Sequence, residues 1–350
     1  GAIGWIVSEE AFMQPLRKVI SKLKLRASYG QVGNANLGGR RFAYLSTITD
    51  DYATLDMYKW GLDSSYGLTG MAEGEFAVQD LTWEIVNKMN LGVELGFLNG
   101  MIDLQLDYFD ERRKDIFMPR ESVPMTAGFM KQPWKNFGKV TNQGVEVTLN
   151  VNKQFGKDLF VSLMGTFTYA HNEITEKDEP SAVVGTNRAE TGHPVGQLTG
   201  YIAEGLFTAD DFEDVSTGKL KEGIPTQSFV GKLRPGDIRY RDVNGDGKVD
   251  VFDKSPIGGT KDPEIVYGFG VNMKYKNLDF GALFQGIGRS WNILGSSIIP
   301  GANRGVTGNM FTNANDRWTV DNPSQNVFYP RLDDGINSNN NQPSTWWLRN

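Results

Sequence analysis

The chain has 350 residues, of which 39% are apolar and 22% are charged, and 36 Lys and Arg residues against 42 Asp and Glu residues give a net charge of −6. This composition excludes a disordered tail, and without a basic excess nucleic acid is not an expected partner. Cysteine is absent and only two histidines occur, which excludes thiol chemistry, disulfides and a His-rich metal site.

The N-terminal residues predict the end of a strand near Val7, a short helix over Glu9–Ile20 and a strand that starts at Leu23. Apolar residues have helical spacing after Ser8, a residue type favoured at N-caps. No basic region or cleavage site precedes this part, so no signal peptide is expected. No apolar run reaches the roughly 18 residues of a membrane helix.

From Leu81 onward, apolar and polar residues alternate over an unusual length. The odd positions up to Phe97 are almost all apolar and the even positions are polar or glycine, which is the two-residue period of a β-strand. Asn99-Gly100, a strong hairpin signal, leads into the next strand at Ile102. The same alternation predicts strands over Phe137–Val151, Leu159–Tyr169, Ile265–Tyr275 and Leu278–Phe284, and the start of an eighth at Trp346.

Short and long connections alternate along this series of strands. Short turns are predicted at Leu98–Met101, Lys153–Asp158 and Lys276–Asn277, and long connections over Gly30–Asp80, Met118–Lys135, Glu173–Pro263 and Trp291–Thr345. All long connections then lie at one end of the sheet, as in outer-membrane barrels with short inner turns and long extracellular loops. We therefore predict an all-β fold, a segment of an antiparallel transmembrane β-barrel. The alternative is a secreted β-helix or β-sandwich whose apolar faces form a core.

The two registers of the strands are predicted to face different surroundings. The apolar register faces lipid. Aromatic residues near the long-loop ends would form part of an interfacial girdle: Trp83, Phe137, Tyr169 and Tyr267. Aromatic residues also favour strands in general. The polar register lines the lumen at Glu84, Lys88, Glu94, Asp103, Gln105, Asp107, Glu146 and Asn150.

A motif of the EF-hand type occupies residues 242–253, within the long extracellular loop predicted over residues 173–263. Oxygen-bearing residues stand at loop positions 1, 3, 5 and 12, Gly247 stands at position 6, and position 7 would contribute its main-chain carbonyl. Aspartate replaces the usual glutamate at position 12, so we expect a weak, structural Ca²⁺ site; a solvated Asx turn is the alternative. The predicted ligands are Asp242, Asn244, Asp246, Lys248 and Asp253.

Other candidate sites carry weaker signals. The loop tryptophans Trp60, Trp134 and Trp318 could stack on sugar rings or anchor the loops to each other. The charged run from Glu111 to Asp115 reads as a solvated strand end. No Ser/His/Asp or paired-carboxylate constellation can be identified, so no catalytic residue is predicted and the chain is not expected to be an enzyme.

Several motifs together resemble the SusC/RagA family of TonB-linked outer-membrane proteins, in the C-terminal part of the barrel. They occur in order over nearly the whole chain, at Leu23–Asn34, Leu81–Glu84, Asn136–Glu146, Gly192–Tyr201, Gly205–Phe207, Leu233–Asp237, the Asp242 loop, Ser255–Gly258 and Ser344–Asn350.

The resemblance implies a 22-stranded barrel, of which residues 1–350 would supply seven to eight strands, with the plug domain and the final strands absent. It implies a Gram-negative outer-membrane location, a SusD-like lipoprotein over the outer loops, and energy from TonB–ExbB–ExbD through the missing N-terminal part. Family substrates are glycans, with peptides in some members.

The competing functions are a secreted calcium-stabilised carbohydrate-binding β-protein and a glycoside hydrolase.

Overall fold

The computed structural model describes residues 1–52, 58–60, 62, 66–68, 70–129, 131–294, 311–333 and 337–350. The chain divides into two compact units. The first unit comprises residues 1–184, 190–193 and 264–287, and the second comprises residues 185–189, 194–263 and 288–350. Within the described residues, no helix has the length and apolar character needed to cross a membrane.

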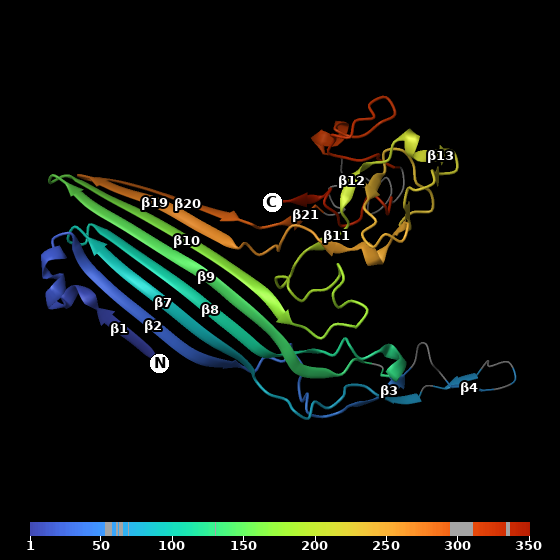
Figure 1. The fold of residues 1–350 in the computed structure, drawn as a ribbon, viewed down its shortest axis with the longest axis horizontal. Helices are drawn as coiled ribbons and strands as arrows, with labels where there is room; N and C mark the ends of the chain where they lie inside the picture. The colour runs from blue at the N-terminus through green and yellow to red at the C-terminus, as the bar shows by residue number, and fades with distance from the viewer. Residues whose placement is uncertain are drawn as a thin grey trace. The chain divides into compact units, whose positions relative to one another are not determined.

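An eight-stranded antiparallel sheet forms the first unit, in the order β1-β2-β7-β8-β9-β10-β19-β20 (Figure 1). All seven strands expected with the two-residue period are present and most are longer than expected. The eighth strand of this sheet is β1, not a strand at Trp346. The bounds are β1 (Ala2–Ile6), β2 (Ile20–Asn34), β7 (Glu84–Phe97), β8 (Ile102–Pro119), β9 (Trp134–Phe155), β10 (Leu159–Glu176), β19 (Ile265–Tyr275) and β20 (Leu278–Gly288).

The connections of the sheet are sorted by length between its two ends. At one end only a few residues separate β7 from β8, β9 from β10 and β19 from β20. The first of these turns has positive φ at Leu98, Asn99 and Gly100, of 51°, 55° and 81°. At the other end Asn34 pairs with Glu84 and Pro119 with Trp134, and long connections leave from these pairs. The predicted alternation of short turns and long loops is therefore confirmed.

The helix predicted over Glu9–Ile20 is wrong in type. The segment forms two 3₁₀-helices, η1 (Val7–Glu9) and η2 (Ala11–Leu16), and Ser8 lies inside η1, where no side chain caps the helix. Pro15 lies inside η2. Because proline has no N–H to donate and its ring crowds the preceding turn, the segment cannot continue as an α-helix.

Small elements occupy two of the long connections of the first unit. β3 (Ile48–Tyr52) pairs with β6 (Gly70–Glu73), and β4 (Tyr58–Trp60) pairs with β5 (Tyr66–Leu68). A short 3₁₀-helix, η3 (Met125–Ala127), lies between β8 and β9.

The second unit is built from short strand pairs around a core of its own. Residues 194–263, within the predicted long loop, fold here together with residues 288–350. Its elements are β11 (Thr199–Gly200), β12 (Ala203–Leu206), η4 (Ala209–Asp211), β13 (Phe212–Asp214), β14 (Lys219–Leu220), β15 (Thr226–Gln227), β16 (Ile238–Tyr240), β17 (Lys248–Val249), η5 (Val251–Asp253), β18 (Ser255–Pro256), β21 (Asn292–Ile293), η7 (Thr312–Asn315) and β22 (Leu348–Arg349).

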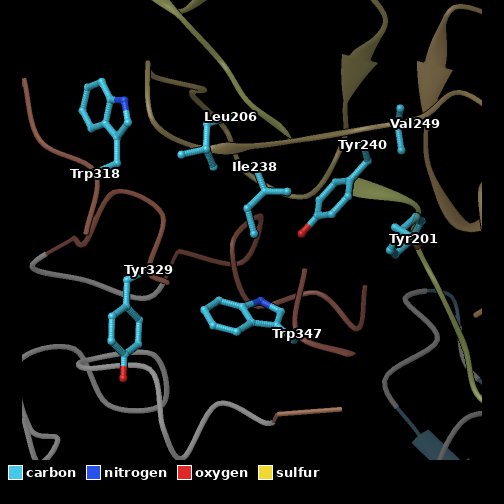
Figure 2. Packing of buried hydrophobic residues seen from close by; sticks show 8 residues of the cluster. All are labelled: Tyr201, Leu206, Ile238, Tyr240, Val249, Trp318, Tyr329 and Trp347. Carbon is cyan, nitrogen blue, oxygen red and sulfur yellow. The ribbon is translucent and has the colours of Figure 1, made fainter. Parts of the chain in front are cut away.

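Aromatic side chains dominate the core of the second unit (Figure 2). Tyr201, Ile238, Tyr240 and Trp347 are each at most 2% exposed, and burial raises the pKa of Tyr201 to about 12. The strand expected to begin at Trp346 therefore belongs to this unit. It forms the two-residue strand β22, which pairs with β21. It does not join the large sheet, because the Trp347 ring is buried in the core of the second unit.

Candidate functional site

The outer register of the sheet is apolar and exposed. Leu25 on β2, Leu91 on β7, Leu149 on β9 and Phe269 on β19 are between 38% and 54% exposed. A soluble sheet would cover such side chains with a second layer, because leaving large apolar groups in water costs about 25 cal/mol per Å². The predicted lipid-facing register is therefore an uncovered apolar surface rather than half of an internal core.

The apolar surface has the height of a membrane. On β19 it covers 11 residues, from Ile265 to Tyr275, and at about 3.3 Å per residue and a tilt of about 35–45° this length projects to about 25–30 Å. Tyr108 and Tyr169 both pair with Val145 at the long-loop end of the surface. The next outer position on each of these three strands is polar: Asp110, Gln143 and His171.

Ion pairs between neighbouring strands cover the inner register of the sheet. Glu94 accepts from Lys22 and Lys24, with N–O distances of 2.6 and 3.3 Å, and Arg26 pairs with Asp107 at 2.6 Å. Beside them, Lys88 pairs with Glu111 at 2.7 Å and Arg113 with Glu84 at 2.6 Å. The polar residues predicted to line the lumen thus share one face. Their cationic partners on β2 were not among the predicted lumen residues.

The long-loop end of the sheet is held together by side-chain contacts between loops. Asp178, which follows β10, accepts hydrogen bonds from the Ser122 N–H at 3.0 Å and the Ser122 hydroxyl, and pairs with Arg120 at 3.0 Å. Glu75 bridges Arg40 and Lys131. These bonds attach separate loops to one frame, as a binding surface built on loops requires.

The loop tryptophans serve as anchors where the structure describes their side chains. Trp318 is 8% exposed, and its ring lies so close to Gly236 that an added Cβ would meet it at 2.3 Å. The Trp134 ring packs against Phe117, with 5.1 Å between the ring centroids, and under the Arg40 guanidinium at 4.1 Å. These contacts favour the anchoring interpretation for Trp318, whose ring is buried, while Trp134 is only partly buried. The Trp60 side chain lies outside the described residues.

Hydrogen bonds to the main chain shape the Asp242–Asp253 loop. Asp242 accepts from the N–H groups of Gly245 and Gly247 at 2.7 and 2.8 Å, and Asp253 accepts from Val243 at 2.8 Å and Asp250 at 2.8 Å. Val249, at loop position 8, is fully buried in the core. No group of three or more His, Asp or Glu side chains within the described residues is arranged to hold a metal.

The main chain of this loop nevertheless leaves a carbonyl for a cation. In the parallel pair of β15 and β17, Gly247 and Val249 accept from Thr226 and Ser228 at 3.1 and 3.2 Å. Because successive carbonyls of a strand point in opposite directions, the Lys248 carbonyl faces away from β15. Asn244 and Asp246 bond to each other and to loop N–H groups.

The second unit also contains a buried polar cluster that the sequence did not reveal. The Asp237 carboxylate is fully buried and accepts from Asn337 at 2.9 Å, from Asn340 at 3.0 Å and from Arg331. Asn339 bonds to Gln227 and to the Ile238 carbonyl. Five of the six residues from 337 to 342 are Asn or Gln, the only signal that could have pointed to this cluster.

The two-sided sheet, with an uncovered apolar outer face, a charged inner face and loops sorted to one end, defines the wall of an outer-membrane β-barrel. The family model described as TonB dependent receptor-like, beta-barrel matches residues 16–321. The chain belongs to this family. The resemblance to SusC/RagA proteins, the fold class and the outer-membrane location expected from the sequence are confirmed.

Relatives with this fold are longer than the chain. It is 28% identical over 337 residues to TonB-dependent receptor P26 of Formosa agariphila, covering 93% of this chain and 31% of the relative. The chain is 30% identical over 297 residues to TonB-dependent receptor SusC of Bacteroides thetaiotaomicron, and the match covers 80% of this chain and 26% of the relative. The chain thus spans about a third or less of these relatives.

A solved structure of the RagAB peptide transporter shows the same fold. The superposition has a TM-score of 0.68 at 22% identity and covers 100% of this chain and 34% of the RagAB chain. The two relatives are named as TonB-dependent receptors and the solved structure as a peptide transporter.

Proposed function

We propose that the chain supplies part of the barrel wall and outer loops of a TonB-dependent importer of glycan or peptide nutrients. The observation that carries the proposal is the sorting of side chains by register. An exposed apolar face meets lipid, and an ion-paired face that includes Glu94 and Asp107 lines the lumen. A barrel of many strands with such a lumen must be plugged or it would leak.

The proposed partners follow from the family. A SusD-like lipoprotein would cover the long loops, and the TonB–ExbB–ExbD complex would supply energy through a plug in the remaining part of the protein. The loop-to-loop bonds of Asp178 and Glu75 support this role, because a cap needs a surface that stays in place between substrates.

An import assay on the complete protein tests the proposal. Cells that produce the protein together with the lipoprotein encoded beside it would be given a fluorescent oligosaccharide or a fluorescent oligopeptide. We expect uptake of one substrate class, and no uptake when TonB is deleted or the lipoprotein is omitted. Uptake that does not depend on TonB would indicate a porin, and a protein found in the aqueous fraction would contradict the barrel.

We further propose that the Asp242–Asp253 loop binds Ca²⁺ as a structural ion. The donor set consists of carboxylate, amide and main-chain oxygens, which suit a hard cation. The left-handed φ of Gly247, 84°, allows the sharp turn at position 6. The Lys248 carbonyl, which faces away from β15, and the buried Val249 match positions 7 and 8.

Terbium luminescence excited through Tyr240, two residues before the loop, tests the calcium site. We expect emission that excess Ca²⁺ quenches and that Asp246→Ala abolishes. The matched control is Asp210→Ala, an exposed aspartate of the same unit, which should retain the emission. Emission of equal strength from both variants, or none from the parent protein, would end the proposal.

A further inference from the structure

An apolar groove crosses the outer face of the sheet. It has a volume of about 830 Å³, within the range of about 300–1,000 Å³ of small-molecule sites. Two neighbouring cross-strand rows form it: one row joins Ile3, Ala27, Leu91 and Tyr108, and the next begins with Trp5. The residues between the two rows direct their side chains to the inner face of the sheet, so their main-chain atoms form the floor of the groove.

Ala27 creates the hollow. Its neighbours in the same row, Ile3 on β1 and Leu91 on β7, are large and rise on either side of its methyl group. A second hollow of about 420 Å³ shares these three residues and extends along the strands to Tyr29 and Met89. The two hollows adjoin at these residues; the second is also lined by Gly1 and Ala2, so the first hollow, over Ala27, is the part lined by side chains of five strands.

The position of the groove on the apolar surface identifies the membrane leaflet that it faces. On β2 the apolar outer register runs from Leu23 to Tyr29, and the groove lies at Leu25 and beyond. The next outer position, Gln31, is polar. The groove thus occupies the half of the surface beside the long loops, which in an outer membrane is the external leaflet. Lipopolysaccharide supplies the acyl chains of that leaflet.

Polar side chains lie directly beyond the end of the groove. Gln31 pairs with Asn87, which pairs in turn with Arg112. The Arg112 side chain is 69% exposed and donates to Asp110 through Nε and Nη2, at 3.1 and 3.2 Å. Its Nη1 group is left for another acceptor. Gln143 also donates to Asp110, at 3.2 Å, so this carboxylate is compensated.

We propose that this groove binds the lipid A part of lipopolysaccharide. Acyl chains would lie between the two rows over Ala27. The sugar hydroxyls would meet the amides of Gln31 and Asn87, and a phosphate would accept from the Arg112 guanidinium, whose planar donors suit phosphate oxygens. The site faces lipid and is separate from the lumen, so it does not depend on which nutrient is imported.

Lipid retention by the complete, delipidated protein in detergent tests the proposal. The probes are a rough-type lipopolysaccharide and phosphatidylethanolamine, and bound lipid is counted by native mass spectrometry. We expect the protein to retain lipopolysaccharide, and Ala27→Phe, which fills the groove, to weaken retention at least tenfold. The matched control Ala282→Phe adds the same ring on the outer register of β20, away from the groove, and should retain lipopolysaccharide as the parent does.

A second variant keeps the test valid if Ala27→Phe fails to fold. Arg112→Gln changes an exposed side chain, and we expect it to weaken retention of lipopolysaccharide several-fold and to leave that of phosphatidylethanolamine unchanged. Equal retention of the two lipids by the parent protein would overturn the proposal. So would equal loss in Ala27→Phe and Ala282→Phe, or no effect of Arg112→Gln.

Discussion

The guanidinium of Arg26 on β2 reaches over Gly92 on β7 to Asp107 on β8, with 2.6 Å between Nη2 and Oδ2. A Cβ added at Gly92 would lie 2.4 Å from Arg26 Nε and 2.6 Å from Asp107 Oδ1. The ion pair thus spans two strand spacings, about 10 Å, because the residue between its partners has no side chain. Asp107 is 8% exposed; Arg26 is its cation, and Gln105 donates a further hydrogen bond to it at 3.0 Å.

Gly92→Ala is expected to displace the Arg26 side chain and to destabilise the barrel by about 1–3 kcal/mol, the usual cost of overpacking. Unfolding of the complete protein by urea in detergent, followed by tryptophan fluorescence, measures the change. Gly30→Ala is the control, because a Cβ at this position on the same register of β2 meets nothing within 4 Å. Equal midpoints for the two variants would show that Gly92 has no such role.

Arg26 and Asp107 are expected to be coupled in a double-mutant cycle. Arg26→Met leaves the Asp107 carboxylate without its cation and should cost about 1–3 kcal/mol. Adding Asp107→Leu should recover part of that loss, since it removes the uncompensated carboxylate, while Gln105, which donates to Asp107 at 3.0 Å, loses its acceptor. The same urea assay gives the coupling energy, and additive effects of the two substitutions would contradict the contact.

The large sheet could be predicted from the sequence because its two faces meet different surroundings. Along β7, Leu91 and Leu95 face one side and Glu94 the other, so apolar and polar residues alternate regularly in the sequence. The same reasoning located the short turns and the residues of the charged face. It could not supply the ion pairs, because the contact between Arg26 and Asp107 depends on strand register and on Gly92, which reads in isolation as one more strand glycine.

The second unit was beyond such reasoning. Its strands have two to four residues, too few to show a period, and its core joins Tyr201 and Ile238 with Trp347, which is more than a hundred positions further along the chain. Trp347 therefore read as part of another barrel strand. The Asp242 motif was visible because its spacing is local, but the hydrogen bonds that Asp253 accepts from the N–H groups of Val243 and Asp250 were not.

Asp237→Ala is expected to loosen the second unit by about 3–5 kcal/mol. The substitution leaves Arg331, whose side chain is 15% exposed, without its buried carboxylate, and removes the acceptor of two asparagine amides. Hydrogen exchange of the Ile238 amide, which donates to Asn340 at 2.8 Å, reports the change. We expect its protection to fall by at least a hundredfold.

An exposed aspartate of the same unit controls for the loss of charge in this experiment. Asp210→Ala, in η4, should leave the exchange of the Ile238 amide as it is in the parent protein. If Asp237→Ala also left it unchanged, the buried cluster would not hold the unit together.

The attachment of the loop after β8 to the end of β10 is expected to weaken in acid. Burial raises the pKa of the Asp178 carboxyl, but hydrogen bonds from Arg120 and Ser122 outweigh it and hold the pKa below its ordinary value. Because the folded pKa is lower than the unfolded one, this stabilisation is complete above about pH 4 and is lost as the pH falls through the folded pKa. Hydrogen exchange of residues 119–124, corrected for the intrinsic rate, should show protection at pH 6 that falls as the pH is lowered below about 4. Asp178→Asn should weaken the protection at pH 6, and equal protection of the variant and the parent protein at pH 6 would refute the role of this carboxylate.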